Sequence, residues 1–134
     1  MFHGLTHSAH RASLGYAVLE GVSFGLADGL NALKQSGTSI QQCSLVGGGS
    51  RSAFWAQLLA DVLGVTVVTH RGGESGGALG AARLAAIANG ASIQEMCTKP
   101  EVQAVYESQP NRSGYLTLRY EQFKALYGKL RVDE

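Results

Sequence analysis

The sequence has 134 residues, which is enough for one domain with a hydrophobic core and short for two. Lysine and arginine number 11 against 10 acidic residues, so the formal charge of +1 indicates neither nucleic acid nor an anionic membrane as a partner. Cys43 and Cys97 lie far apart, which favours free thiols in a reducing cytoplasm over a disulfide framework. The most apolar segment, residues 78–88, is too short to span a bilayer, and the N-terminus lacks the layout of a signal peptide. We therefore expect a soluble, cytoplasmic protein.

A long helix is predicted over residues 12–34, because apolar side chains recur there at every third or fourth position. The predicted buried stripe consists of Leu14, Val18, Val22, Leu26, Leu30 and Leu33, widened by Phe24 and Ala27. Ser36 and Gly37 provide a stop. Residues 43–46 form a short apolar run between polar residues and glycines, which predicts a buried strand.

The segment LVGGGSRSAFW, residues 45–55, carries three consecutive glycines between that strand and a second predicted helix at 53–63. Ser52 is the expected N-cap of this helix, since its hydroxyl can accept from free amides, and Gly64 is the expected stop. Residues 65–69, VTVVT, are rich in β-branched side chains and predict a second strand.

The remaining chain is predicted to be mostly helical. GGESGG, residues 72–77, introduces a helix at 78–88 with a face of small side chains that would let it approach a sheet or helix closely. Residues 89–113 look irregular, with Pro100 and Pro110 as breakers and a short helix near 93–97. A closing amphipathic helix at 116–130 presents Leu116, Tyr120, Phe123, Tyr127 and Leu130.

Two strands are few for the number of predicted helices. Ordinary sheets have about five or six strands, and a buried parallel pair leaves rows of unpaired amides and carbonyls at its edges. We infer that partner strands are missing and come from an upstream part of a longer polypeptide or from a second copy of the chain. The alternative is an overlooked strand at 106–109 or before residue 12.

The glycine turn has the layout of an anion or nucleotide site, because a strand, a glycine-rich turn and a helix N-terminus together expose free amides. GGGSRS has no lysine where a P-loop requires one. It also has Ser52 where the dinucleotide fingerprint requires a third glycine, which disfavours a small Rossmann-like oxidoreductase. From the residues of this segment alone, the alternative interpretation as a structural turn that binds no ligand remains open.

Three ordered motifs carry a family resemblance. LVGGGSRSAFWAQLLADVLGVTV, followed by GGALGAARLAAIA, closely resembles the C-terminal domain of the FGGY carbohydrate kinases, and among them the xylulokinases. GLTHSAHRASLGYAVLEG resembles the second signature of that family, although Ser13 stands where the signature usually has His, Asn, Asp, Glu or Gln. The resemblance runs from about Phe2 to Gly90, with a looser match in YEQFKALY. It implies an α/β fold that is part of an actin-like, ribonuclease-H-like ATPase, with residues 1–134 as the C-terminal nucleotide-binding part.

The resemblance also implies a site and a reaction. Carried over by position, Gly47, Gly48 and Gly49 are the turn along which adenosine lies, and Ser52 is the polar residue that faces adenine. The complete enzyme would use ATP and Mg²⁺ to phosphorylate a sugar, D-xylulose. The general base, the phosphate loops and most sugar contacts would lie in the absent N-terminal part. We therefore expect no catalytic residue and no metal ligand in this chain, and no turnover by the chain alone.

The aspartates of the chain do not occupy the family's catalytic motif. We expect Asp28 on the polar side of the first helix, Asp61 on the outer face of the second, and Asp133 at the frayed end. Other chemistry-bearing residues also have ordinary explanations. Glu74 is expected to act as a helix-dipole partner, with an acid or metal ligand as the alternative. Arg51 is expected to be solvent-exposed, with contact to a nucleotide phosphate as the alternative, and His70 to form a surface pair with Arg71, with a place near the nucleotide cleft as the alternative. The aromatic residues Trp55, Tyr120, Phe123 and Tyr127 are expected to be core or interface.

Two further hypotheses stay open. His3, His7 and His10 would share one face of a helix, which suggests zinc, but a polar N-terminal segment explains them as well. The second functional class is a non-catalytic module that binds nucleotide or forms a homodimer through its open sheet edges and apolar helices.

Overall fold

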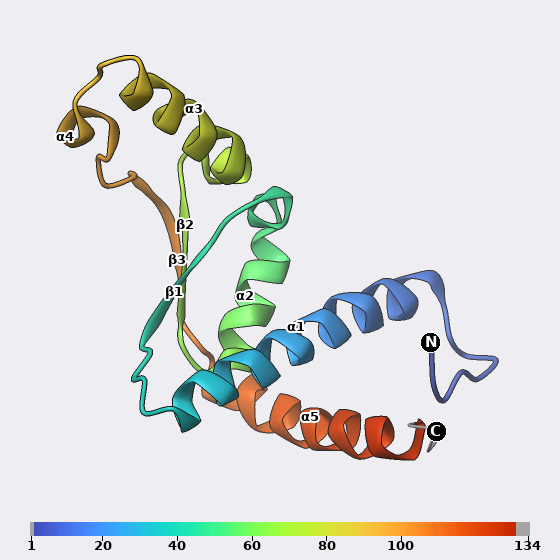
Figure 1. Ribbon diagram of the computed structural model, residues 1–134. Helices are drawn as coiled ribbons and strands as arrows, with labels where there is room; N and C mark the ends of the chain where they lie inside the picture. Colours follow the sequence, from blue (N-terminus) through green and yellow to red (C-terminus); the bar gives the residue numbers. More distant parts are fainter. Residues whose placement is uncertain (1, 131–134) are drawn as a thin grey trace.

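The computed structural model describes residues 2–130, with the side chain of Leu130 left out. The order of elements along the chain is α1 (Arg11–Gln35), β1 (Gln42–Leu45), η1 (Gly48–Arg51), α2 (Ala53–Leu63), β2 (Thr66–His70), η2 (Gly73–Ser75), α3 (Gly76–Ala88), α4 (Ile93–Met96), β3 (Val102–Tyr106) and α5 (Pro110–Leu130). Figure 1 shows α1 and α5 side by side at one end of the molecule and α3 and α4 at the other. The prediction for Asp133 lies outside the described residues.

A three-stranded sheet joins the two ends, in the order β1-β2-β3. β1 and β2 are parallel, as predicted, with Gln42 opposite Thr66 and Leu45 opposite Thr69. β3 was not predicted and pairs antiparallel with β2, which it meets through an irregularity between Thr69 and His70. The prediction of an irregular segment at 89–113 is therefore wrong for residues 102–106. The alternative of an overlooked strand was correct in that a third strand exists. It was wrong in position, because the strand was expected at 106–109 and β3 ends at Tyr106.

The core lies between α2 and the sheet. Ala56, Leu59 and Ala60 of α2 are buried against Val67 of β2. Around them pack Leu45, Trp55, Leu63 and Tyr106. The predicted bounds of α2 are confirmed, as is its stop, because Gly64 adopts a left-handed conformation with φ 62°.

The buried side of α1 agrees with the predicted stripe at Phe24, Ala27 and Leu30 but differs from it elsewhere. Glu20, Ser23, Phe24, Ala27 and Leu30 are the buried residues of this helix. The exposed row consists of Val18, Val22, Leu26 and Leu33, each about half exposed. α1 packs against α2 and α5, where Ser23 forms a hydrogen bond with Trp55 of α2 and Glu20 forms one with Arg119 of α5. These hydrogen bonds allow the two polar side chains to be buried.

α5 begins earlier than predicted. Pro110 is its first residue, where a missing amide hydrogen costs nothing because that amide has no intrahelical partner. Phe123 and Tyr120 pack on Phe24 of α1 with ring centroids 5.5 Å apart in both cases. Tyr127 is exposed.

Asp61 does not lie on an outer face, as was predicted, but is 1% exposed. Its Oδ1 accepts from the Gln109 amide at 2.9 Å and from Gln57 Nε2 at 3.0 Å, and its Oδ2 lies 3.3 Å from Arg112 Nη1. The carboxylate therefore joins α2 to the start of α5, two elements that are close in space but far apart in sequence.

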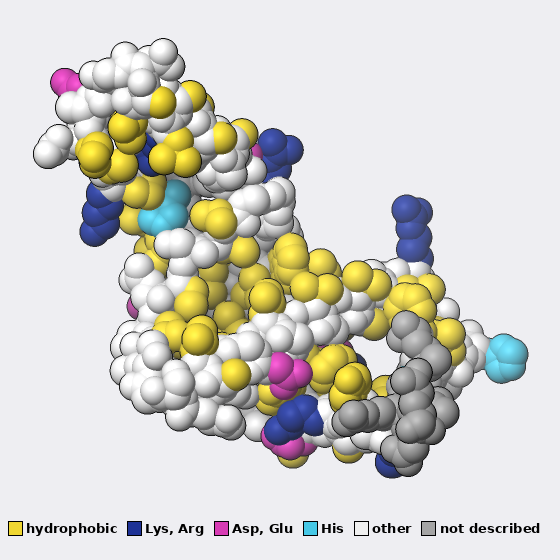
Figure 2. Space-filling model, in the orientation of Figure 1, with side chains coloured by type: hydrophobic (Ala, Val, Ile, Leu, Met, Phe, Trp, Pro, Cys, Tyr) yellow, Lys and Arg dark blue, Asp and Glu magenta, His cyan; other side chains and the backbone are white. Residues whose placement is uncertain are grey.

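Several surfaces of the described residues have no neighbour. β1 is an edge strand whose residues alternate between exposed and half-buried, so the prediction of a buried strand is wrong here. α3 buries no residue, and its small-residue face, which includes Leu84 at 70% exposure, does not make the expected close approach. Figure 2 shows apolar side chains gathered on one face over α1 and α2. Across residues 2–130, none of the helices combines the length and apolar character needed to cross a membrane.

Candidate nucleotide site

Two glycine-rich turns lie side by side at one end of the sheet. β1 and β2 are parallel, so the turns that follow them, at η1 and η2, leave from the same edge (Figure 1). The Gly47 amide donates to the Gly73 carbonyl oxygen at 2.9 Å, which holds the two turns together. α2 and α3 begin directly after them, so two helix N-termini, each with a partial positive charge, start at this edge.

The three glycines of the first turn have different structural reasons. Gly47 has φ 85° and ψ −176°, a backbone conformation that is essentially restricted to glycine. At Gly49 an added Cβ would lie 2.3 Å from Cζ3 of Trp55, so the indole ring occupies that space. Gly48 has an ordinary negative φ, and an added Cβ would meet no atom within 4 Å. Only at Gly48, therefore, does the described structure give no internal reason for glycine.

Ser52 confirms its predicted role as N-cap of α2. Its Oγ accepts from the Trp55 amide at 3.2 Å, and the residue is half-buried. Ser50 Oγ donates to the Gly47 carbonyl oxygen at 2.8 Å and braces the turn from inside. Gly47, Gly48, Gly49 and Ser52 thus lie in one short segment between β1 and α2, and their assignment to a nucleotide stays a prediction.

A recess of about 340 Å³ lies beside this surface. It is lined by Ser50, Arg51, Ala53, Thr69, Glu74, Gln103, Ala104 and Tyr106. Arg51 is exposed, as predicted, and Glu74 lies in η2 just before α3. The three residues from β3 were missed because that strand was not predicted. The β-branched and aromatic side chains of VQAVY were a local signal for this strand, but a weak one over five residues.

His70 is buried at the end of β2, which corrects its predicted surface position. Its Nε2 lies 2.9 Å from Ser44 Oγ on β1, and its Nδ1 is buried without a hydrogen-bond partner. Arg71, by contrast, is exposed and pairs with Glu101 at 3.1 Å. His70 thus helps to fix β1 against β2 directly below the turns.

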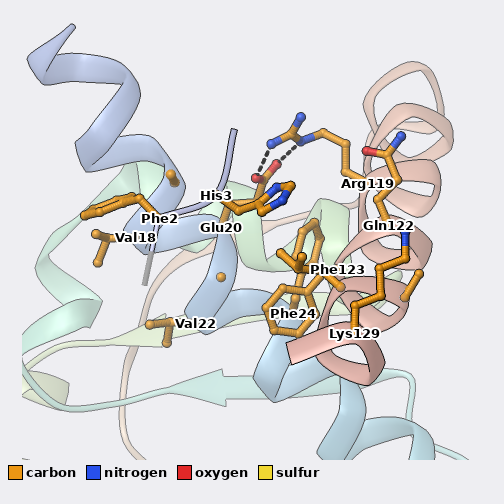
Figure 3. Close-up of a pocket in the computed structure, with 14 residues that line it drawn as sticks. Phe2, His3, Val18, Glu20, Val22, Phe24, Arg119, Gln122, Phe123 and Lys129 are labelled. Atoms are coloured by element: carbon orange, nitrogen blue, oxygen red, sulfur yellow. Dashed lines mark hydrogen bonds and ion pairs between the residues drawn. The ribbon is translucent and has the colours of Figure 1, made fainter. Parts of the chain in front are cut away.

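A larger cavity of about 860 Å³ lies between α1, α5 and the N-terminal residues. Figure 3 shows the tilted, adjacent rings of Phe24 and Phe123 on its wall and the paired side chains of Glu20 and Arg119 above them. None of its lining residues comes from the glycine turns. The carboxylate on its wall, Glu20, is already neutralised by Arg119, and the other titratable side chains that line the cavity are His3 and Lys129.

No group of three or more His, Cys, Asp or Glu side chains suited to a metal ion is found within residues 2–130. Of the three N-terminal histidines, His10 caps α1, since its Nδ1 accepts from the Ser13 amide at 3.1 Å. Cys43 and Cys97 are free thiols, as predicted.

Known proteins match the chain in sequence and in fold. The family described as "FGGY family of carbohydrate kinases, C-terminal domain" matches residues 1–89. The xylulose kinase of Escherichia coli (strain K12) is 39% identical over 132 residues, which are 97% of this chain and 27% of that protein.

Two solved structures show the same arrangement. The first, described as a xyloylose kinase from Brucella ovis, superposes with a TM-score of 0.81 at 40% identity. The second, the xylulose kinase from Rhodospirillum rubrum, superposes with a TM-score of 0.75 at 29% identity. In both cases 97% of this chain covers 27% of the other, so the chain spans about a quarter of its relatives' length. The predicted α/β, actin-like fold is confirmed, and the chain belongs to the FGGY family of carbohydrate kinases.

Proposed function

We propose that this chain is the C-terminal, ATP-binding part of a carbohydrate kinase, and that the complete enzyme converts ATP and D-xylulose into ADP and D-xylulose 5-phosphate. The sugar is inferred from relatives that are named xylulose kinases. The free thiols of Cys43 and Cys97 support a reducing compartment, the cytoplasm, for this enzyme.

The observation that carries the ATP site is the open backbone at Gly48. This residue needs no unusual conformation and no internal space, yet it has no side chain. Glycine inside a regular element costs about 0.5–1 kcal/mol relative to alanine. Other open glycines, such as Gly114, lie within helices, whereas Gly48 lies in the turn between a strand and a helix N-terminus, where a ligand can reach its backbone. A flat nucleoside resting on this peptide would use that space.

The neighbouring groups suit a nucleotide. The Ser52 hydroxyl already accepts from the Trp55 amide and keeps its own hydrogen free to donate to a ring nitrogen of adenine. The N-termini of α2 and α3 favour the negative charge of phosphate, each by about 0.3–1 kcal/mol. Arg51 lines the adjacent recess and adds a positive charge there.

The proton-accepting base and the Mg²⁺ ligands are assigned to the rest of the enzyme. Asp61 is buried and paired with Arg112, and Asp28 accepts a short hydrogen bond from the Tyr120 hydroxyl. A carboxylate that is already engaged in this way is a poor general base, because it must first give up its partner. ATP would supply the phosphoryl group, and this chain would bind and orient its nucleoside end.

The unpartnered surfaces support a larger polypeptide. β1 has an open outer edge, and Val18, Val22, Leu26 and Leu33 form an exposed apolar row on α1. The chain spans 27% of the Escherichia coli relative, so the remaining kinase is long enough to cover both surfaces. A homodimer would cover them too, and light scattering of the purified chain separates the two, because only a homodimer gives twice the monomer mass.

The nucleotide site is tested by equilibrium dialysis of the 134-residue chain against radiolabelled ATP with Mg²⁺. We expect Gly48→Ala to weaken ATP binding about tenfold while the thermal midpoint stays unchanged. Gly114→Ala on α5 is the matched control, because its added Cβ also meets no atom within 4 Å but lies on another element. Equal ATP affinity of Gly48→Ala and the unmodified chain would refute the site.

The reaction is tested with a chimera in which this chain replaces the matching 132 residues of the Escherichia coli xylulose kinase. The chimera is expected to phosphorylate D-xylulose, which tests whether this chain can serve as the C-terminal part of such a kinase, and the isolated chain is expected to have no kinase activity. A folded chimera without kinase activity, or turnover by the chain alone, would contradict the assignment.

A further inference from the structure

The side chain that shapes the glycine turn is Trp55, in the first turn of α2. An added Cβ on Gly49 would lie 2.3 Å from Cζ3 and 2.8 Å from Cε3 of the indole. Carbon atoms in contact normally stay about 3.5–4.0 Å apart, so the six-membered ring lies directly on the Gly49 backbone. The position of this peptide is therefore set by the position of the ring.

The ring itself is fixed at its other end. Trp55 Nε1 donates to Ser23 Oγ on α1 at 3.1 Å, and Ser23 is 0% exposed. The Ser23 hydroxyl donates in turn to the Leu19 carbonyl oxygen at 2.7 Å. The hydrogen bond to Ser23 fixes the orientation of the indole ring about its side-chain bonds. In this orientation the ring both bonds to Ser23 and lies on the Gly49 backbone.

The backbone of Trp55 completes the connection, since its amide donates to Ser52 Oγ at 3.2 Å. Ser52 and the glycine turn are the residues assigned above to the nucleoside. Trp55 thus contacts the turn through its ring, Ser52 through its amide and α1 through its indole nitrogen.

We propose that Trp55 is a positioning residue for the nucleotide: the indole, oriented by Ser23, holds the Gly49 peptide and thereby the open Gly48 surface at the place where adenosine rests. This proposal depends on the proposed ATP site. Gly49 and Gly48 then have separate roles, the first making room for the ring and the second for the ligand.

Paired substitutions test this division of roles through the dissociation constant of ATP. Trp55→Leu removes the ring atoms that lie on Gly49. Relative to the unmodified chain, we expect Gly49→Ala to weaken ATP binding at least tenfold. Relative to Trp55→Leu alone, we expect the double variant Gly49→Ala/Trp55→Leu to weaken ATP binding no more than about threefold. Gly114→Ala on α5 is the matched control, because its added Cβ meets no atom within 4 Å and it should leave ATP affinity unchanged in both backgrounds.

Tryptophan emission gives a second readout, since the sequence contains one tryptophan. Ser23→Ala removes the acceptor of Trp55 Nε1 while leaving the glycine turn and α2 unchanged in sequence. We expect it to shift the emission maximum and to weaken ATP binding about threefold. Ser23→Ala also keeps the proposal testable if Trp55→Leu does not fold.

The outcomes separate the two proposals. Failure of the unmodified chain to bind ATP would overturn the ATP site and the positioning role together. If the unmodified chain binds ATP, equal penalties for Gly49→Ala in both backgrounds, or unchanged affinity and emission in Ser23→Ala, would overturn the positioning role alone. A lower thermal midpoint of folded Trp55→Leu with unchanged ATP affinity would show that Trp55 is structural, and would overturn it as well.

Discussion

Replacing Arg119 by methionine is the sharpest stability test of the way in which α5 is held on α1. Arg119 Nε lies 2.5 Å from Glu20 Oε1, and its Nη2 donates to Oε2 at 2.6 Å, so the pair is bidentate (Figure 3). Glu20 is 4% exposed. The hydrogen bond with Glu20 raises the pKa of Arg119, so the guanidinium stays charged wherever the protein is folded. Arg119→Met leaves this buried carboxylate without its partner.

The expected cost follows from burial on the two sides of the pair. Removing one partner of a fully buried pair costs about 3–5 kcal/mol. The Arg119 side chain is 37% exposed, so water screens part of the interaction and we expect about 2–3 kcal/mol. At about 2.1 cal/mol/K per residue, the unfolding entropy of 134 residues is roughly 0.28 kcal/mol/K. The midpoint should therefore fall by roughly 7–11 °C.

Thermal and urea unfolding followed by circular dichroism measure this loss. The double variant Glu20→Met/Arg119→Met removes both charges and is expected to recover most of it, because a buried pair and a well-packed apolar pair are often close in stability. Glu121→Gln, on the exposed side of α5, should leave the midpoint unchanged. A single variant as stable as the unmodified chain, or a double variant no better than the single, would refute the reasoning.

Three further predictions concern stability. Asp61→Ala removes the acceptor of the Gln109 amide and should cost about 2–3 kcal/mol in urea unfolding; equal stability would contradict the buried role of Asp61. Gly64→Ala places a Cβ at φ 62° and should cost about 1–2 kcal/mol, whereas an unchanged denaturation midpoint would count against the left-handed stop of α2. Burial, followed by the hydrogen bond to Asp28, raises the pKa of Tyr120 above 10.0. The stabilisation of the folded state by the protonated Tyr120 hydroxyl is thus fully present below about pH 10 and is lost as the pH rises through the pKa of the folded state. Tyr120→Phe should lose stability less steeply than the unmodified chain in unfolding above that pH, and an equal slope would count against this.

The parts of the fold that were predicted correctly are those with local signals. The bounds of α2 follow from Ser52 before it, Gly64 after it and an apolar face between them. β2 was displaced by one residue but recognised from its β-branched side chains. The glycine turn was predicted between the first strand and α2, because a strand and a helix need a connection there.

The missed parts depend on contacts between distant residues. β3 gains its place by pairing with β2, where Val105 lies opposite Val68, and its five residues carry little signal of their own. Pro110 reads as a breaker in isolation but is well suited to the first position of α5. Asp61 was expected at the surface because an aspartate on an amphipathic helix usually is. Its burial follows from the start of α5, whose Gln109 amide and Arg112 side chain supply its partners.

The place of the glycine turn was predicted from the sequence, but the separate structural reasons for its glycines were not. Three adjacent glycines suggested one explanation, a ligand lying on bare backbone. The structure gives Gly47 a conformational reason and Gly49 a packing reason, the indole of Trp55 six residues along the chain. No periodicity relates Gly49 to Trp55, since one lies in a turn and the other in a helix. The distinction narrows the ligand hypothesis to Gly48 and makes it testable at a single residue.

The two rows of α1 show how an incomplete set of neighbours changes which face of a helix is buried. The row through Val18, Val22 and Leu26 has the stronger apolar pattern, yet each of these side chains is about half exposed. The row that is buried instead contains the carboxylate of Glu20 and the hydroxyl of Ser23. Their burial is tolerated because Arg119 and Trp55 form hydrogen bonds with them. The row that includes Glu20 and Ser23 packs against α2 and α5 within the chain. The row of Val18, Val22 and Leu26 would be covered by polypeptide outside the chain. This exposed row agrees with a larger kinase in which more polypeptide packs on α1.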